Sequence, residues 1–409
     1  MNWKKKSERN WGRLGMKSKW QIEKIGKLVD IRRGSSPRPI HKFLTNAGMP
    51  WVKIADATSD SSRYLLKTNE YIIDEGIEKS VVVEPETLIV SNSATPGLPK
   101  IMKTKACVHD GWLVFSNYRG ITRDFLYYKF IDIRQKLVNQ ANGSVFQNLK
   151  TNIVKDFAIS IPSIQTQNKI VDILSKLDEK IELNNAINNN LEQQLNAIFV
   201  NMFADKIDNL EDDTTTLADL VGIVDNRGKT PPLSVEVTDY PIIDVKALSG
   251  NSRIIDYNNC TKYVSEDTYN TWFRSGHPQP EDILISTVGS LAEMKIFLGD
   301  IGCIAQNVVG FRSKEISPYY LYQYLNYIKH DLVAYNIGSV QPSIKITHII
   351  KHAIYVPDEQ QIKAFDTLAR SISNQIFANC NENKNLTQLR DTLLPKLMSS
   401  ELDVSNIDL

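Results

Sequence analysis

The sequence contains two copies of one pattern, because position n matches position n + 195 over most of its 409 residues. Pro85 matches Pro280, in PETLIVSNS and PEDILISTV, and a local shift to an offset of 196 pairs Cys107 with Cys303. Further matches join Lys100-Ile101 with Lys295-Ile296, Gly143-Ser144-Val145 with Gly338-Ser339-Val340, Pro162 with Pro357, and Ile181, Asn184, Asn188 and Leu191 with Ile376, Asn379, Asn383 and Leu386. Two long copies exclude a solenoid, which needs several short stacked units. They predict two similar modules related by a pseudo-twofold axis, which suits a bipartite target such as duplex DNA.

The composition is that of a globular protein with two to three domains, since 42% of the residues are hydrophobic and 23% are charged. No apolar run reaches the roughly 18 residues of a membrane span. The basic N-terminus lacks the apolar core of a signal peptide, and Met16 is an alternative start to Met1. Four isolated cysteines favour a reducing cytoplasm, with neither a disulfide nor a structural zinc ion.

Charge is distributed unevenly along the chain, although the net charge is only +1. Residues 1–160 carry 27 Lys and Arg against 15 Asp and Glu, whereas residues 161–409 carry 21 against 32. Such asymmetry indicates nucleic acid as a partner of the basic part, and solvated surface charge is the alternative interpretation. Residues 214–357 carry 12 basic against 14 acidic side chains, so the second module is expected to bind DNA weakly alone.

Four segments follow from these patterns. Residues 1–160 form a first mixed α/β domain with a basic arm at 1–18, and residues 214–357 form a second. Residues 161–213 and 358–409 each form a long helix. A helix is expected at 122–140 with a counterpart at 318–335, and β-like runs at 157–161 and 352–356 end at prolines before the long helices.

The two long helices carry apolar side chains at spacings of three and four, from 165 to 204 and from 360 to 400. Asparagines interrupt both apolar stripes, and polar residues in such a stripe fix register and pairing. We therefore expect the two helices to pair as an antiparallel coiled coil, although each could instead pack only on its own domain. The expected pairing residues are Ile181, Asn184, Leu191, Ile376, Asn379 and Leu386. The predicted fold class is α+β, with two repeated α/β domains separated by this coiled coil.

Motifs for catalysis are absent from the sequence. It contains no glycine-rich phosphate loop, no amino-methyltransferase motif and no nucleophile elbow. His348 and His352 have the spacing of a zinc pair but no evident third ligand. Asp282, Glu293 and Lys295 resemble a metal-dependent nuclease site, yet the first copy lacks an acidic partner beside Lys100.

Polar loops at matching positions are better candidates for function, since they combine glycine with side chains that bind phosphates or base edges. Ordinary turns with local caps are the alternative. The candidate DNA contacts in the first copy are Arg32, Arg33, Ser36, Arg38, Ser91, Asn92, Ser93, Asn142, Ser144 and Gln147. Those in the second copy are Arg227, Lys229, Thr230, Ser286, Thr287, Ser290, Ser339 and Gln341.

The chain resembles the specificity subunits of type I restriction-modification systems. Its ending at 389–402, LRDTLLPKLMSSEL, is similar to the family pattern L-R-x-x-L-L-P-x-L-hydrophobic-S-G-E, with Ser400 in place of glycine. The central LDEKIELN at 177–184 resembles the family's L-D-x-x-I followed by asparagine, and Pro162 and Pro357 resemble its junctions. The resemblance extends from about residue 19 to the C-terminus.

The resemblance implies a non-catalytic subunit in which each of two target recognition domains reads one half of a split, asymmetric double-stranded DNA site. It also implies that the helices space these domains and dock two methyltransferase subunits, and that two motor-nuclease subunits add restriction. S-adenosylmethionine, ATP and Mg²⁺ would belong to those partners, and this subunit would hold no cofactor. An orphan DNA-binding protein of the same fold, a metal-dependent nuclease and a purely structural scaffold are the alternatives.

Overall fold

The computed structural model describes residues 20–58, 62–141, 148–210, 215–299, 301–405 and 407. It divides into two compact units. Unit 1 comprises Met1–Glu182 with Lys384–Leu409, and unit 2 comprises Leu183–Asn383. The predicted basic arm and Met16 lie outside the described residues. Each long helix contributes one part to each unit.

The central sheet of unit 1 has the strand order β2-β11-β8-β9-β5. Its strands are β2 (Asp30–Arg33), β5 (Tyr64–Leu65), β8 (Leu88–Ser91), β9 (Pro99–Met102) and β11 (Trp112–Ser116). All neighbours are antiparallel except β5 and β9. Strands β8 and β9 are buried along their whole length. Both faces of this sheet are therefore covered, which explains why these segments are nearly continuous apolar runs rather than alternating ones.

A second sheet in unit 1 has the order β3-β6-β4-β10-β7. Its strands are β3 (Leu44–Thr45), β4 (Met49–Val52), β6 (Glu70–Ile72), β7 (Val81–Val83) and β10 (Ala106–Val108). Short helices η1 (Ile40–Lys42), α2 (Ile54–Thr58) and α3 (Asp74–Ile77) lie in its connections. Trp51, Ile72 and Cys107 form its small core.

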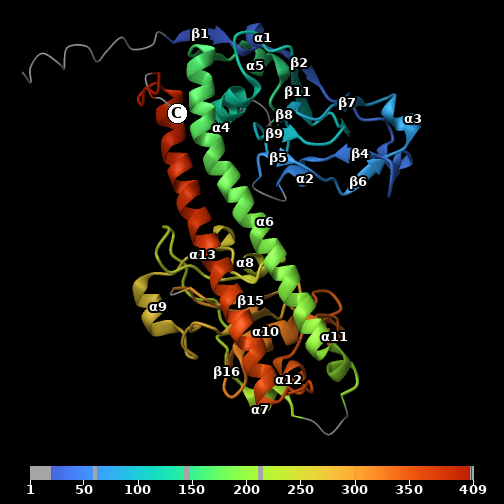
Figure 1. Ribbon diagram of the computed structural model, residues 1–409, viewed down its shortest axis with the longest axis vertical. Helices are drawn as coiled ribbons and strands as arrows, with labels where there is room; N and C mark the ends of the chain where they lie inside the picture. The colour runs from blue at the N-terminus through green and yellow to red at the C-terminus, as the bar shows by residue number, and fades with distance from the viewer. Residues whose placement is uncertain are drawn as a thin grey trace, which may run out of the picture. The chain divides into compact units, whose positions relative to one another are not determined.

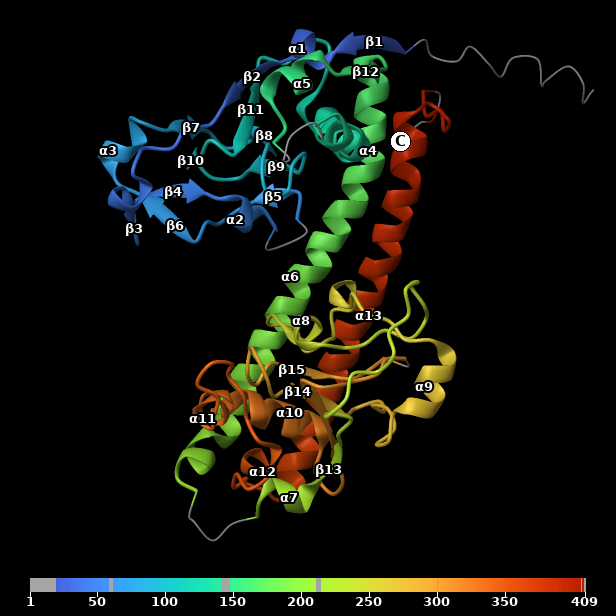
Figure 2. The same cartoon turned by 180° about the vertical axis from the view of Figure 1, so that it is seen from behind.

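Helices cover the central sheet of unit 1 on the side of the long helices. Helix α4 (Arg123–Ala141) confirms the helix predicted at 122–140, and it lies between the sheet and α6 in both views (Figures 1 and 2). Its aromatic residues Phe125, Tyr128 and Phe130 are buried. Strands β1 (Gln21–Lys24) and β12 (Ala158–Ile161) form an antiparallel pair, joined to helices α1 (Ile25–Leu28) and α5 (Thr151–Asp156).

Unit 2 repeats the central sheet with the order β13-β16-β14-β15. Its strands are β13 (Val221–Val224), β14 (Ile283–Ser286), β15 (Met294–Ile296) and β16 (Val308–Ser313). An isolated parallel bridge between Ile254 and Ile296 replaces the pairing of β5 with β9. The same strand order in both units agrees with the internal repeat of the sequence.

The helices of unit 2 differ from prediction in one place. The prediction of a single helix at 318–335 is wrong, because the chain forms α10 (Pro318–Tyr327) and α11 (Lys329–Ala334) with a break at Ile328. The Asn326 side chain donates to the carbonyl of Tyr322 at 2.8 Å, and such local bonds compete with the helical ladder. The other short helices are α7 (Leu217–Leu220), α8 (Val245–Leu248), η2 (Tyr257–Asn259), α9 (Glu266–Trp272) and α12 (Ile346–Ile349).

The β-like run predicted at 352–356 is also not a strand. Only an isolated bridge joins Ala353 to Thr216, whereas the matching segment of unit 1 pairs over four residues as β1 and β12. The Ile354 amide donates to the carbonyl of Thr215 (2.9 Å), so the two ends of the second domain still lie side by side without forming a regular ladder.

The two predicted long helices are confirmed as α6 (Ile164–Asp208) and α13 (Glu359–Met398). In unit 1, Ile170 and Leu174 of α6 share a core with Leu394 and Leu397 of α13. In unit 2, Phe199 and Phe203 of α6 pack against Phe365 of α13 and against Tyr320 of α10. Within each unit the residue number rises along one helix as it falls along its partner, so the pairing is antiparallel.

Candidate nucleic-acid interface

The loops that carry the predicted contacts in unit 1 meet at one edge of its central sheet, where β2 and β8 end and β11 begins. Asp110 is at their centre. Its carboxylate accepts a hydrogen bond from Ser36 Oγ (2.8 Å) and lies 3.6 Å from Arg33 and 3.4 Å from Arg38. Burial alone would raise the pKa of Asp110, but the Ser36 hydrogen bond and the charges of Arg33 and Arg38 hold it below its ordinary value.

The arginines of this cluster remain accessible. The Arg38 side chain is 78% exposed and the Arg33 side chain 57% exposed. Arg32 donates to the carbonyl of Val82 at 2.9 Å and so ties β2 to the second sheet. An ionised carboxylate therefore orients exposed guanidinium groups, an arrangement suited to an anionic or base-edge ligand.

Four of the predicted contact residues are buried and hold the loops together. Ser91 and Ser286 occupy equivalent positions, and their hydroxyl groups donate to the carbonyls of Thr95 and Ser290. The amide of Asn92 donates to the carbonyl of Asp110 at 3.0 Å, and Thr287 donates to the carbonyl of Asn307 at 3.3 Å. These bonds shape the loops, whereas direct DNA contact by the four side chains stays an untested prediction.

In unit 2 the equivalent loops converge around Arg227. Asp225 accepts two hydrogen bonds from its guanidinium, at 2.9 Å to Nε and 3.0 Å to Nη2. The remaining nitrogen, Nη1, is 3.4 Å from Thr287 Oγ1. Arg274 donates to the carbonyl of Arg227 at 2.8 Å. The guanidinium is thus held in one orientation, with its Nη1 edge directed away from Asp225.

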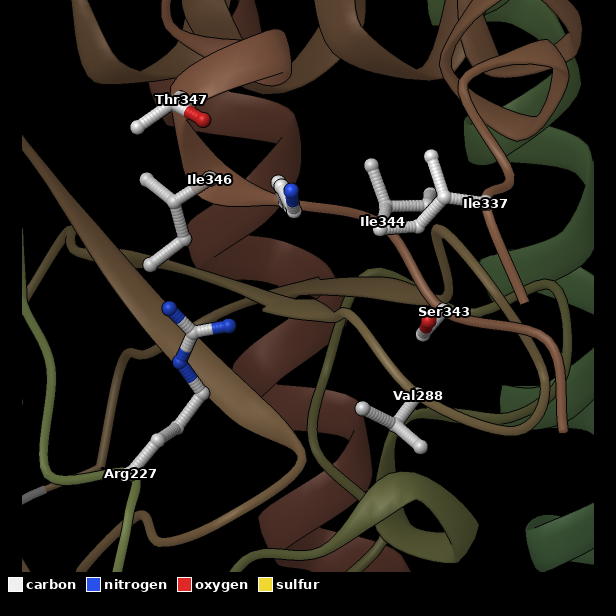
Figure 3. A pocket seen from close by; sticks show the side chains of 8 residues that line it. Arg227, Val288, Ile337, Ser343, Ile344, Ile346 and Thr347 are labelled. Carbon is white, nitrogen blue, oxygen red and sulfur yellow. The ribbon is translucent and has the colours of Figure 1, made fainter.

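A pocket of about 380 Å³ opens beside Arg227. Figure 3 shows the guanidinium pointing toward Ile346, with Val288 and Ser343 on the neighbouring loops. The loop at 287–290 is joined to the loop at 336–343 by the hydrogen bond from the Gly289 amide to the carbonyl of Pro342 (2.9 Å). Apolar walls with cationic groups from Arg227 and Lys345 give the pocket a mixed character.

The remaining predicted contacts lie around these clusters. Lys229, Thr230, Ser290, Ser339 and Gln341 are exposed, and Thr230 accepts a hydrogen bond from Gln306. Ser93 is half-buried. Asn142, Ser144 and Gln147 lie outside the described residues. The structure thus brings together the loops of Arg227, Thr287 and Gln341 in unit 2, and those of Arg33, Arg38 and Asn92 in unit 1.

The orienting groups Asp110, Asp225, Arg274 and Gln306 were not among the predicted site residues. Asp225 stands two residues before Arg227, so the local sequence Asp-Asn-Arg carried a usable signal. Asp110 is 72 residues from Arg38, and only the fold brings the two together. Asp110 and Gln306 match each other at the offset of 196, which the cysteine pairing had already indicated.

The predicted pairing residues lie within the helix pair of each unit. In unit 2, the Asn184 amide donates to Asn383 at 2.9 Å, and the Asn379 amide donates to Asn188 at 2.7 Å. Ile376 is buried and Leu191 packs against the same core. Ile181 and Leu386, both in unit 1, are half-buried. The asparagines therefore satisfy each other across the helix pair, as a register-fixing role requires.

The residues of the alternative nuclease site are engaged by different partners. Asp282 forms a bidentate ion pair with Arg312 (2.7 and 3.0 Å), Glu293 pairs with Lys329 (3.1 Å), and Lys295 donates to main-chain carbonyls. Nδ1 of His352 is 2.9 Å from the Tyr335 hydroxyl. Within the described ranges, no group of three or more His, Cys, Asp or Glu side chains is placed to hold a metal ion. None of the helices in those ranges is long and apolar enough to cross a membrane.

Comparison with known proteins assigns the chain to a family. The family described as Type I restriction modification DNA specificity domain matches residues 17–193 and again 211–388. The specificity subunit of the type I restriction enzyme MjaIX from Methanocaldococcus jannaschii is 23% identical, over 95% of this chain and 94% of the relative. The HindI specificity subunit from Haemophilus influenzae is 26% identical, over 65% of this chain and 74% of the relative.

A solved structure shares the fold. The crystal structure of the type I restriction-modification S subunit from M. genitalium superimposes with a TM-score of 0.55 at 16% identity, covering 94% of this chain and 98% of that one. The resemblance seen in the terminal and central motifs is therefore confirmed. Because the family matches most of the sequence in two tandem copies, the chain belongs to the type I restriction-modification DNA specificity family.

Proposed function

We propose that this chain is the DNA-recognition subunit of a type I restriction-modification complex, in which each repeated domain reads one half of a split DNA site. The observation that carries the proposal is the repeated loop cluster. In both units, three loops meet at the same edge of the same sheet, and a carboxylate orients arginine at that edge. Arginine in a fixed orientation is the side chain that most often reads guanine in the major groove.

The two recognition domains are expected to divide the work unequally. Phosphate contacts supply most of the salt-dependent affinity, and the basic residues concentrate in residues 1–160. The second domain carries slightly more acidic than basic side chains, so its contribution is base reading within an already assembled complex. The oriented Arg227 beside its pocket is the strongest candidate for that reading.

The partners follow from the family. We propose that two methyltransferase subunits dock on the helices and modify an adenine in each half-site, taking it out of the duplex. Two motor-nuclease subunits would add restriction. S-adenosylmethionine, ATP and Mg²⁺ would be held by these partners, and the chain itself would contribute recognition without catalysis.

The test is methylome sequencing of host DNA with the gene intact and with the gene deleted. Loss of one split adenine motif on deletion is the expected result, and it reads the target directly. An unchanged methylome together with no co-purifying methyltransferase would contradict the proposal.

Complementation with Arg227→Ala sharpens the test. One base position in one half-site should relax, by about 1–3 kcal/mol of discrimination, while the other half-site stays unchanged. Lys314→Ala is the matched control, because Lys314 is an exposed cation at the opposite edge of the same sheet, just after β16. The control should leave the motif intact.

A further inference from the structure

Each repeat contains a buried arginine directly after a serine whose carbonyl accepts a hydrogen bond from a buried lysine, and the two copies are built alike. In unit 1, Lys100 on β9 donates to the carbonyl of Ser62, and the next residue, Ile101, donates from its amide to the carbonyl of Arg63 (2.9 Å). In unit 2, Lys295 on β15 donates to the carbonyl of Ser252, and Ile296 donates to the carbonyl of Arg253 (2.9 Å). Arg63 and Arg253 are therefore equivalent, although they are 190 rather than 195 residues apart.

Arg253 joins its domain to both long helices. Its guanidinium contacts both oxygens of Glu192 on α6, at 3.0 Å from Nε and 2.6 Å from Nη2. Its Nη1 donates to Ser373 Oγ on α13 at 2.8 Å. Its main-chain amide also donates to Glu192 at 2.8 Å. The Arg253 side chain is 0% exposed, so one fully buried group fixes three chain segments of unit 2 to one another.

Arg63 reaches the same two helices through a relay. Its Nη1 is 3.3 Å from the Tyr128 hydroxyl, which donates to Asp178 on α6 at 2.6 Å. The other oxygen of Asp178 accepts a hydrogen bond from Arg390 on α13 at 2.9 Å. Arg63 also lies 3.8 Å from Glu179. The domain of unit 1 is thus tied to its helix segments at the position equivalent to that of Arg253.

These contacts specify orientation more than they stabilise the fold. Burying a charge pair costs desolvation that largely offsets its attraction. A planar guanidinium that makes several hydrogen bonds, however, accepts only one relative placement of its partners. Apolar packing holds the domain against the helices in each unit, but it is non-directional and does not fix their relative orientation. A buried arginine is therefore suited to setting the angle of a domain on its helices.

We propose that Arg253 and Arg63 are positioning residues that fix each recognition domain on the helix segments of its own unit, so that the complex accepts only one gap length between half-sites. This inference rests on the proposed function. Neither arginine is on the loop edge that carries the candidate DNA contacts. Their removal should therefore change gap selectivity and leave the bases read in each half-site unchanged.

The experiment uses the full chain in complex with its methyltransferase, acting on duplexes that carry the motif with its native gap or a gap one base pair shorter or longer. Arg253→Met should reduce the discrimination between native and altered gaps by roughly tenfold, equivalent to about 1.4 kcal/mol. Point changes within either half-site should be rejected as strongly as by the unmodified chain.

Arg312→Met is the matched control. Arg312 forms an equally short bidentate pair with the buried Asp282, but this pair lies inside the recognition domain and includes neither long helix. The control should lose stability without losing gap selectivity. Equal loss of selectivity in both variants would show a general effect of destabilisation and would overturn the proposal.

Two further variants guard against misfolding. Glu192→Gln combined with Arg253→Met removes both charges, so no unpaired ion stays buried, and it should reproduce the relaxed gap. Arg253→Lys should restore selectivity in part. If the folded double variant keeps its gap selectivity, the positioning role is refuted and the proposed function still stands. If the complex with the wild-type chain recognises no split motif at all, the proposed function is refuted as well.

Discussion

The recognition domains of the two units share a frame but differ in what is built on it. Both have the same order of four core strands and the same buried serine as the last residue of the third strand in that order. Unit 1 adds a five-stranded second sheet, whereas the described residues of unit 2 form isolated bridges there, such as Ile242 with Cys303 in place of β4 with β10. The four core strands that position the loops are thus the same in both units, whereas the second sheet differs.

A second difference concerns the attachment to the long helices. Position 178 in the first copy is a buried aspartate bonded to Tyr128 and Arg390, and the matching position 373 is a serine bonded to Arg253. In unit 2 the carboxylate comes instead from Glu192. Nε of Arg63 is buried without a hydrogen-bond partner among the described residues, whereas Nε of Arg253 contacts both oxygens of Glu192. The two attachments share a position but differ in chemistry.

The largest difference between the units is expected from Asp178→Ala and Ser373→Ala. Asp178→Ala leaves the buried Tyr128 hydroxyl without its acceptor and leaves Arg390 with Asp391 alone, and it should lower the free energy of unfolding of unit 1 by about 3–5 kcal/mol. Ser373→Ala removes one hydrogen bond while Arg253 keeps Glu192, and it should cost about 1.5 kcal/mol in unit 2. Hydrogen exchange by mass spectrometry resolves the two units. Equal costs would show that the attachments are energetically equivalent despite their chemistry.

An intermediate effect is expected at a glycine that the two copies share. A Cβ at Gly34 would lie 2.1 Å from the main-chain oxygen of His109, whereas a Cβ at Gly228 would meet nothing within 4 Å. Gly34→Ala should therefore cost roughly 3 kcal/mol and displace the loop of Asp110. Gly228→Ala should cost only about 1 kcal/mol, from its φ of +108°. Urea denaturation of both variants measures this, and similar values would contradict the close approach at Gly34.

The smallest effect is a pH dependence specific to unit 2. Burial lowers the pKa of Lys295 to about 8, although the charges of Glu192 and Glu293 oppose the shift. An unfolded lysine titrates near 10.4, so between pH 8 and 10 the unfolded state binds more protons and the free energy of unfolding rises with pH. The rise should be roughly 2 kcal/mol and absent in Lys295→Met. Hydrogen exchange across this pH range tests it, and an identical slope in Lys295→Met would refute it.

The sequence was sufficient to predict the repeat, the long helices and the family, since all three rest on spacings that are local or strictly periodic. Asn184 and Asn379 were predicted as helix-pairing residues because they interrupt apolar stripes at matching places. In the structure Asn184 bonds to Asn383 and Asn379 bonds to Asn188. Such periodic signals can be read from the sequence because the buried face of a helix requires apolar residues at spacings of three and four.

The rest depends on contacts that sequence spacing does not encode. Asp110 meets Arg38 across 72 residues, and nothing in either segment indicates the other. The equivalence of Arg63 and Arg253 was hidden because the connection from the arginine to the lysine is five residues longer in the second copy. The break at Ile328 lies beside a side-chain hydrogen bond from Asn326 to the main chain, which apolar spacing does not reveal.

The pairing of β1 with β12 brings the first and last segments of the first recognition domain together, with Gln21 opposite Ile161. In the second domain, Thr216 meets Ala353 in the same way. Each domain is therefore a closed segment whose two ends leave at one place, next to a long helix. Genetic exchange with breakpoints near residues 20 and 162, or 215 and 357, would replace all the strands and short helices of one domain together. If each domain reads one half-site, as proposed, a gene of this design can acquire a new half-site in a single recombination event while the helices stay unchanged.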